Sequence, residues 1–283
     1  MAFAVNTTTN ASILKTTYDS DFGLDPTEEA VVASYVAQPV GATAIGNTLT
    51  LRKIAAAVAG KYTGTSGLPA NLTATTANTE AAVTTTLSYG YAMLEIDENA
   101  MTRLVDDAKY RTGIRKQLSA AVNAQLDADL FALGASLSSS ESGADIDDTM
   151  LRSALKQLAT NAKGKFKLGQ TPVRLFINPS QVDSVLGIST IREYQIRGSA
   201  GSAPSGQMVN AYGISFAESG SLAVNAGNYN NALILPDAWA LGYNIKPSFL
   251  KDQEDGIVTR MIFRAEYGVC EWFDSSGVKL VTT

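Results

Sequence analysis

The residues of this chain that could do chemistry by type and spacing are its aspartates and its glycine–lysine pairs. Aspartates recur through the middle of the sequence: Asp106, Asp107, Asp127, Asp129, Asp145, Asp147 and Asp148. A calcium loop needs an alternating Asp/Asn series with a glycine and a closing glutamate, and none of these aspartates stands in one. We therefore expect these carboxylates to cap helices or to face solvent, and we expect no metal site.

The other chemical signals point to no catalytic residue and no cofactor. The pairs Gly60-Lys61 and Gly164-Lys165 lack the upstream glycine and the following Ser or Thr of a phosphate-binding loop. The chain contains no histidine and one cysteine, which excludes imidazole chemistry, a Cys-His dyad and an intrachain disulfide. Cys270 stands in an apolar strand just before Trp272, so we expect a packed small side chain and not a reactive thiol.

Composition and charge limit the partners of the chain. Its 283 residues are 45% hydrophobic and 17% charged, which is ordinary for a protein with a buried core. A net charge of −5 argues against a protein that grips nucleic acid by neutralising phosphates. The N-terminus lacks the features of a secretory signal, and no apolar run approaches the ~20 residues that span a bilayer. We expect a chain that lies in the cytosol, or in something assembled there, with no membrane partner.

The element that organises the chain is a long helix expected over residues 97–133. Apolar residues recur in it at steps of three and four, which defines one buried stripe. Asp97 and Glu98 would open the helix with carboxylates, and Gly134 would cap its end. Such a helix would be about 55 Å long, more than a compact core needs. We expect it to bend near Gly113, since glycine weakens a helix interior.

Basic residues cluster in the middle of this helix, among Asp106 and Asp107. They are Arg103, Lys109, Arg111, Arg115 and Lys116. The spacing from Arg103 to Asp107, and from Asp107 to Arg111, suits ion pairs within the helix. The alternative is contact with a partner subunit, and the sequence leaves both open.

Two strands with period-two alternation are expected between residues 47 and 96, joined by a long polar segment rich in Thr, Gly and Asn. An isolated hairpin of this kind is marginal in water, so we expect a neighbouring subunit to stabilise it. The candidates for contact with neighbouring subunits are Leu49, Leu51, Lys61, Leu87 and Tyr89 in the hairpin segment, and Arg103, Arg111 and Arg115 in the long helix.

The residues before the hairpin and after the long helix also show patterns that predict secondary structure. Residues 1–24 indicate an extended arm, and the sequence from Asp25 to Pro39 predicts a short helix. After a Ser-rich connector at 137–148, Asp147 to Ala162 predicts an amphipathic helix, Val173–Ile177 a strand, and Asn178-Pro179 the start of another helix. Short strands are expected at 213–216 and 232–235. Strict alternation predicts one strand over residues 261–273, with Cys270 on its opposite face, and a last strand at 278–281. The flexible Gly/Ser segment 198–206 would be a surface loop.

This order of parts resembles the major capsid protein of tailed bacteriophages, the Hong Kong 97-type fold. The sequence VRLFINPSQVD at 173–183 is similar to the axial-domain strand and helix of that family, and FRAEYGVCEWFDSSGVKLV at 263–281 to its closing peripheral strands. The resemblance implies an α+β capsid fold with four parts. These are an N-terminal arm with a short helix (1–46), an extended hairpin loop (47–96), a peripheral domain with the spine helix (97–145 and 241–283), and an α/β axial domain (146–240).

The resemblance also implies a function: a structural protein, not an enzyme, that assembles with itself as hexamers and pentamers into an icosahedral shell. The shell would enclose double-stranded DNA without sequence-specific binding, with separate scaffolding and portal proteins, and would be assembled in the host cytoplasm as part of the virion. In some members a lysine of the extended loop crosslinks neighbouring chains, and Lys53 and Lys61 match by position alone. An encapsulin-like compartment of the same fold and a histidine-independent enzyme are the alternatives.

We predict that deleting residues 60–80 leaves a soluble chain but abolishes or misdirects shell formation. The deletion spares the elements from Asp97 onward, so helix content measured by circular dichroism should stay near that of the intact chain. Electron microscopy of the same preparation reports on shells. An unfolded deletion variant, or one that still closes normal shells, would contradict the interpretation of the hairpin as an assembly arm.

Overall fold

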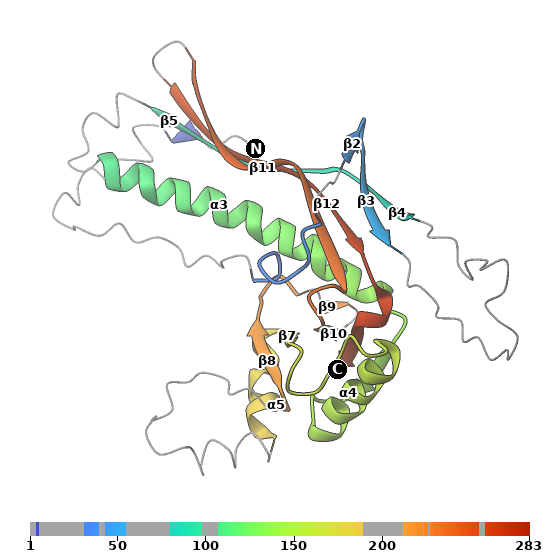
Figure 1. The fold of residues 1–283 in the computed structure, drawn as a ribbon. Helices are drawn as coiled ribbons and strands as arrows, with labels where there is room; N and C mark the ends of the chain where they lie inside the picture. The colour runs from blue at the N-terminus through green and yellow to red at the C-terminus, as the bar shows by residue number, and fades with distance from the viewer. Residues whose placement is uncertain are drawn as a thin grey trace, which may run out of the picture.

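The computed structural model describes residues 4–5, 31–39, 43–54, 80–97, 107–188, 212–222, 224–225, 227–254 and 258–283. These residues form an α+β fold with one long helix, two larger sheets and a small three-stranded sheet (Figure 1). The α+β class expected from the sequence is therefore confirmed.

The four-stranded sheet has the order β1–β5–β12–β11 and lies along the long helix α3 (Asp107–Ala132) (Figure 1). Its strands are β1 (Ala4–Val5), β5 (Ser88–Asp97), β12 (Val258–Glu271) and β11 (Trp239–Glu254). One face of β12 is apolar and buried in the core that contains α3; its residues there are Met261, Phe263, Ala265 and Tyr267. The alternation expected for this strand is thus confirmed from Met261 to Cys270, and it determines which face of the sheet meets the helix. The strand ends at Glu271, and Phe273, expected on the same face as Met261, packs with Cys270 instead.

The larger sheet has the order β6–β13–β10–β7–β8, and β9 pairs with β10. Its strands are β6 (Ser140–Gly143), β13 (Gly277–Thr282), β10 (Asn228–Ile234), β7 (Val173–Ile177), β8 (Ile214–Glu218) and β9 (Val224–Asn225). Leu175 on β7 packs in the core that contains α4 (Asp148–Asn161) and α5 (Val182–Gly187), whereas Phe176 packs in the core that contains α3. Because β7 is buried on both faces, its sequence is almost continuously apolar.

Three short 3₁₀ helices complete the described elements: η1 (Leu133–Ser136), η2 (Pro179–Gln181) and η3 (Asp274–Ser276). The helix expected from Asp147 is confirmed as α4, where the Asp147 carboxylate accepts a hydrogen bond from the Met150 amide at 2.7 Å. Asn178 likewise caps η2, and the helix expected after it continues as α5.

The base of the expected hairpin is present as β3 (Thr48–Ile54) paired with β4 (Glu80–Thr86), with β2 (Thr43–Ile45) beside β3. Leu49 and Leu51 are 1% and 0% exposed and pack with Cys270 on the far face of β12. A side chain at Gly268 of β12 would lie 2.6 Å from Thr85 of β4, so a glycine is needed where the two sheets meet. The hairpin base is therefore folded onto its own chain. The expectation that Leu49 and Leu51 rest on a neighbour for lack of apolar surface in the same chain is wrong.

The long helix differs from expectation at both ends. Asp97 does not open it but ends β5, where it pairs with Val258, and helix α3 is described from Asp107. Gly134 does not cap it in a left-handed conformation but lies buried in η1, where a Cβ would be 3.6 Å from the ring of Trp239. The close approach of Trp239, and not a helix end, accounts for this glycine.

Three more expectations need correction or lie outside the described residues. The described part of the short helix expected from Asp25 to Pro39 forms turns and bends at residues 31–36. The Ser-rich connector contains β6, and residues 239–254 form β11, a strand of 16 residues that the sequence did not reveal. Proline at position 247 and two register shifts between Tyr243 and Ser248 interrupt its alternation. The loop at 198–206 is outside the described residues.

Replacing Leu51 by alanine should lower the free energy of unfolding of the isolated subunit by about 2–5 kcal/mol, since the side chain is fully buried in its own chain. Urea unfolding measures this difference. The matched control is Ile45→Ala in the neighbouring strand β2, where the side chain is 73% exposed and the expected change is within about 0.5 kcal/mol. Equal stability of the two variants would place Leu51 outside the core of the subunit.

Candidate functional site

The described residues show neither a cluster of metal-binding side chains nor a helix that could span a membrane. Among them, no group of three or more His, Cys, Asp or Glu side chains is close enough to share a metal ion. Cys270 is 7% exposed and packs beside Trp272, as expected for a packed small side chain. None of the helices that the structure describes combines the length and apolar character needed to cross a bilayer.

A strap formed by residues 31–38 is attached to the long helix through one buried carboxylate. Asp127 lies in α3 with 2% of its surface exposed. Its Oδ2 accepts hydrogen bonds from the amides of Val31 at 2.7 Å and Val32 at 3.4 Å, and its Oδ1 accepts one from Ala33 at 3.1 Å. Successive backbone N–H groups form a concave anion site, and bonds to a charged acceptor are stronger than neutral ones. Asp127 thereby fixes where the chain reaches the helix.

The same strap also reaches the larger sheet and the start of β11. The Ala37 amide donates to Pro236 O at 2.8 Å, and Ala37 O accepts from the Leu241 amide at 2.9 Å. The Tyr35 hydroxyl lies 3.0 Å from Pro172 O and 3.2 Å from Ile234 O. Burial raises the pKa of Tyr35, so its hydroxyl keeps the proton that it donates. The strap thus joins the long helix to both larger sheets.

The outer face of the four-stranded sheet, away from α3, carries exposed apolar side chains. Tyr89 and Tyr91 of β5 are 51% and 65% exposed, with ring centroids 5.9 Å apart. Met93 follows at the next outward position, in register with Ile262 of β12 and, through it, with Leu250 of β11. A row of exposed aromatic and aliphatic groups on a folded subunit is typical of a surface that meets another protein.

In the structure, some of the interface residues expected from the sequence are buried within the subunit and others are exposed. Leu49, Leu51 and Leu87 are buried in their own chain, whereas Tyr89 is exposed. Arg115 is exposed on α3, with its guanidinium carbon 6.0 Å from the centre of the Phe249 ring.

The remaining candidates are only partly described. Gly113 is buried within α3, which is one helix from Asp107 to Ala132, so a bend there stays a prediction. Arg111 belongs to α3, but its side chain is not described. Lys61 and Arg103, and with them the ion pair expected between Arg103 and Asp107, lie outside the described residues.

Sequence reasoning missed Asp127 as an attachment point. The available signal was its position, three residues before Leu130 and four before Phe131, on the side of the helix that is buried. A carboxylate at such a position needs donors, and the strap amides supply them.

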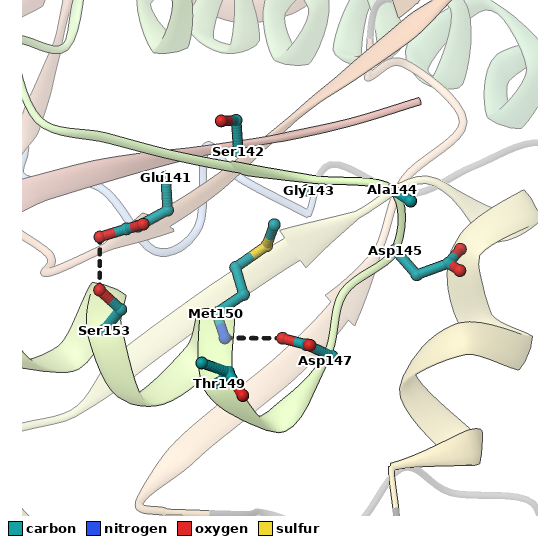
Figure 2. A pocket seen from close by; sticks show the side chains of 9 residues that line it. All are labelled: Glu141, Ser142, Gly143, Ala144, Asp145, Asp147, Thr149, Met150 and Ser153. Carbon is teal, nitrogen blue, oxygen red and sulfur yellow. Dashed lines mark hydrogen bonds between the residues drawn. The ribbon is translucent and has the colours of Figure 1, made fainter.

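A groove lies at the start of α4, beside strand β6 (Figure 2). Its volume is about 440 Å³, and it is lined by Glu141, Ser142, Gly143, Ala144, Asp145, Asp147, Thr149, Met150 and Ser153. The Met150 side chain rises from the helix towards β6, and Glu141 accepts a hydrogen bond from the Ser153 hydroxyl at 2.5 Å (Figure 2). The groove is therefore acidic at its rim, with an apolar side chain on its floor.

Replacing Asp127 by asparagine should speed hydrogen exchange at the amides of Val31, Val32 and Ala33 by roughly ten- to a hundredfold, because an amide side chain keeps one acceptor oxygen and loses the charge. Exchange measured residue by residue tests this. The matched control is Asp129→Asn, two residues along the same helix, where the carboxylate binds the Tyr267 hydroxyl at 2.7 Å. Equal protection of the three amides in both variants would contradict the role of Asp127.

Comparisons with known proteins identify the fold. No protein-family model matches the chain, and no curated protein matches its sequence. Among solved structures, the chain is similar to one from Mycobacterium phage Che8, with a TM-score of 0.63 and 16% identity over 93% of this chain and 95% of that one.

Two further similar structures describe capsids or heads by name. The capsid structure of Cyanophage P-SCSP1u matches with a TM-score of 0.66 and 13% identity over 94% of this chain and 92% of that one. The head structure of Helicobacter pylori bacteriophage KHP40 matches with a TM-score of 0.65 and 12% identity over 100% of this chain and 98% of that one. The chain therefore has the fold seen in phage capsids, as the resemblance to the Hong Kong 97-type fold implied.

Proposed function

We propose that this chain is the major capsid (head) protein of a tailed double-stranded DNA phage, and that copies of it assemble into an icosahedral shell. The observation that carries the proposal is the extent of the structural match. Phage capsid and head structures align with 94–100% of this chain and 92–98% of their own chains. A likeness over whole chains includes the long helix and both larger sheets, and not a single common motif.

The surfaces and charge of the subunit support a structural role. Exposed Tyr89, Tyr91 and Met93 give the subunit apolar area to cover by association. The net charge of −5 suits a shell that encloses DNA without gripping its phosphates. In this proposal the chain is a building unit of the virion, assembled in the host cytoplasm as hexamers and pentamers with separate scaffolding and portal proteins.

The domain division expected from the sequence is part of the proposal, with one adjustment. Residues 1–46 would act as an arm, 47–96 as the extended hairpin, 97–145 with 241–283 as the peripheral domain, and 146–240 as the axial domain. Because β5 pairs with β12, the hairpin proper would be confined to β3, β4 and the segment between them. Tyr89, Arg115, Lys61, Arg103 and Arg111 remain our candidates for contacts with neighbouring subunits.

Electron microscopy of the purified chain tests this function. We expect closed icosahedral shells, and we expect particles from phage-producing cells to contain DNA that resists added nuclease. Shells that hold a protein cargo bound through a peptide, without DNA, would identify an encapsulin-like compartment instead. A purified chain that stays monomeric under all assembly conditions, or that turns over a substrate as a monomer, would contradict the proposal.

A further inference from the structure

The turn that follows α4 is basic and has an apolar tip. Residues 163–169 contain Lys163, Lys165 and Lys167 and no acidic residue. Leu168 is 65% exposed at this turn, among the most exposed large apolar side chains of the described residues. Lys165 is engaged within the subunit, with its Nζ 2.8 Å from Asp237 Oδ2. Lys163, Lys167 and Leu168 are therefore the groups that the turn offers to a partner.

The turn is held in one shape by its own bonds. Phe166 is 8% exposed and belongs to the core around α4. The Thr171 amide donates to Lys167 O at 2.9 Å, and the Lys167 amide donates to the Thr171 hydroxyl at 2.9 Å. Gly164 and Gly169 have φ angles of 87° and 74°, in the left-handed region that glycine adopts without strain. A turn that is rigid before binding loses little conformational entropy when it docks.

The groove at the other end of α4 has complementary properties. The acidic residues of its lining, Glu141, Asp145 and Asp147, form what we call its rim, and the largely buried Met150 lines it between α4 and β6 (Figure 2). A Cβ at Gly143 would lie 2.7 Å from the Met150 methyl group, so the glycine in β6 leaves the room that this side chain occupies. Strand β6 is the edge of its sheet and pairs with β13 alone among the described strands, so none of these strands covers its outer side.

We propose that the turn 163–169 of one copy of this chain docks in the groove of the next copy, with Leu168 directed towards Met150 and Lys163 and Lys167 towards the acidic rim. The occupant is a second copy because the complementary charges and the apolar tip lie on the same chain. Helix α4 has 14 residues and is about 21 Å long, so the turn cannot reach the groove of its own subunit. The inference rests on the proposed shell function.

This contact is heterologous, since two different surfaces of identical chains meet. Repetition of a heterologous contact builds a ring when the rotation between copies closes. Hexamers and pentamers would then share one contact with slightly different angles. The opposite charges also determine which surfaces meet, because a contact between two turns or between two grooves would place like charges together.

Charge reversal at the turn tests the proposal. In Lys163→Glu/Lys167→Glu the turn becomes acidic, and we expect the concentration at which shells first form to rise by roughly tenfold or more. The matched control is Lys156→Glu, one charge reversal of the same kind at an exposed position within α4, which should assemble as the unchanged chain does. Circular dichroism establishes that each variant is folded, and Leu168→Asn is a second variant that should weaken assembly without a change of charge.

A change in the charge of the groove tests whether shell formation by the turn variant can be restored. The change Ser142→Lys/Asp145→Lys replaces the net negative charge of the rim by no net charge, since Glu141 and Asp147 remain, and it leaves the helix cap at Asp147 intact. Alone it should also impair shells. All four substitutions in one chain should restore them. A mixture of the turn variant and the groove variant should form even-membered rings, in which the two alternate, but no pentamers.

The outcomes separate this inference from the proposed function. If the unchanged chain forms no shells, even in phage-producing cells that supply the scaffolding and portal proteins, the function itself is wrong. If it forms shells and the folded turn variant forms them equally well, the docking inference is wrong. Failure of the four-substitution chain to assemble, after each pair alone has blocked assembly, would equally overturn the pairing of this turn with this groove.

Discussion

The packing of α3 against the four-stranded sheet is the contact on which the remaining structure depends. The buried stripe of the helix consists of Ile114, Leu118, Val122, Leu126 and Leu130, each at most 8% exposed. Beyond it, Phe131 meets the ring of Trp239 at 6.4 Å and that of Phe176 at 5.6 Å, both edge to face. Trp239 opens β11 and Phe176 lies in β7, so the end of one helix holds a strand from each larger sheet. Displacing the helix would expose both sheets at once.

Two carboxylates on this helix form hydrogen bonds that fix the position of the packed elements along it. Asp127 accepts hydrogen bonds from the amides of the strap, and Asp129, two residues later, accepts one from the Tyr267 hydroxyl. Burial, together with the bond to Asp129, raises the pKa of Tyr267, so the phenol remains a donor through the neutral range. Apolar packing alone tolerates sliding and rotation, whereas hydrogen bonds to fixed oxygens select one position along the helix. The polar groups therefore set the register of the strap and the sheet on α3.

Much of this architecture was predictable because its elements follow simple periods. The alternation in β12, the stripe in α3 and the Asp147 cap of α4 each report a local rule that the fold obeys. The misses share a different origin. The sequence of β11 loses its period-two alternation at a bulge. Asp97 and Gly134 looked like helix ends because their true partners are distant in the sequence: the strand partner of Asp97 and the tryptophan ring beside Gly134 both come from more than a hundred residues away. Asp127 was missed as a strap anchor for the same reason, since its donors lie 94–96 residues earlier.

The burial of the hairpin base in its own chain changes where assembly energy can come from. Leu49 and Leu51 are already buried when the subunit folds. Gly268 and Thr85 hold the base of the hairpin against β12, and this contact fixes the direction in which the hairpin leaves the subunit. In the proposed shell, association must then draw on apolar groups that folding leaves uncovered, and in the described residues these lie at the outer sheet face, at Phe249, at Ile45 of β2 and at Leu168. The sheet face belongs to the four-stranded sheet and the Leu168 turn to the unit around α4, on opposite sides of the Phe131–Trp239 contact. A subunit that is rigid at that contact presents both surfaces at a fixed mutual angle, so little of the association energy is lost in ordering the chain. In the proposed shell, a subunit that is rigid at this contact would leave the curvature between neighbouring copies to be absorbed at the interfaces.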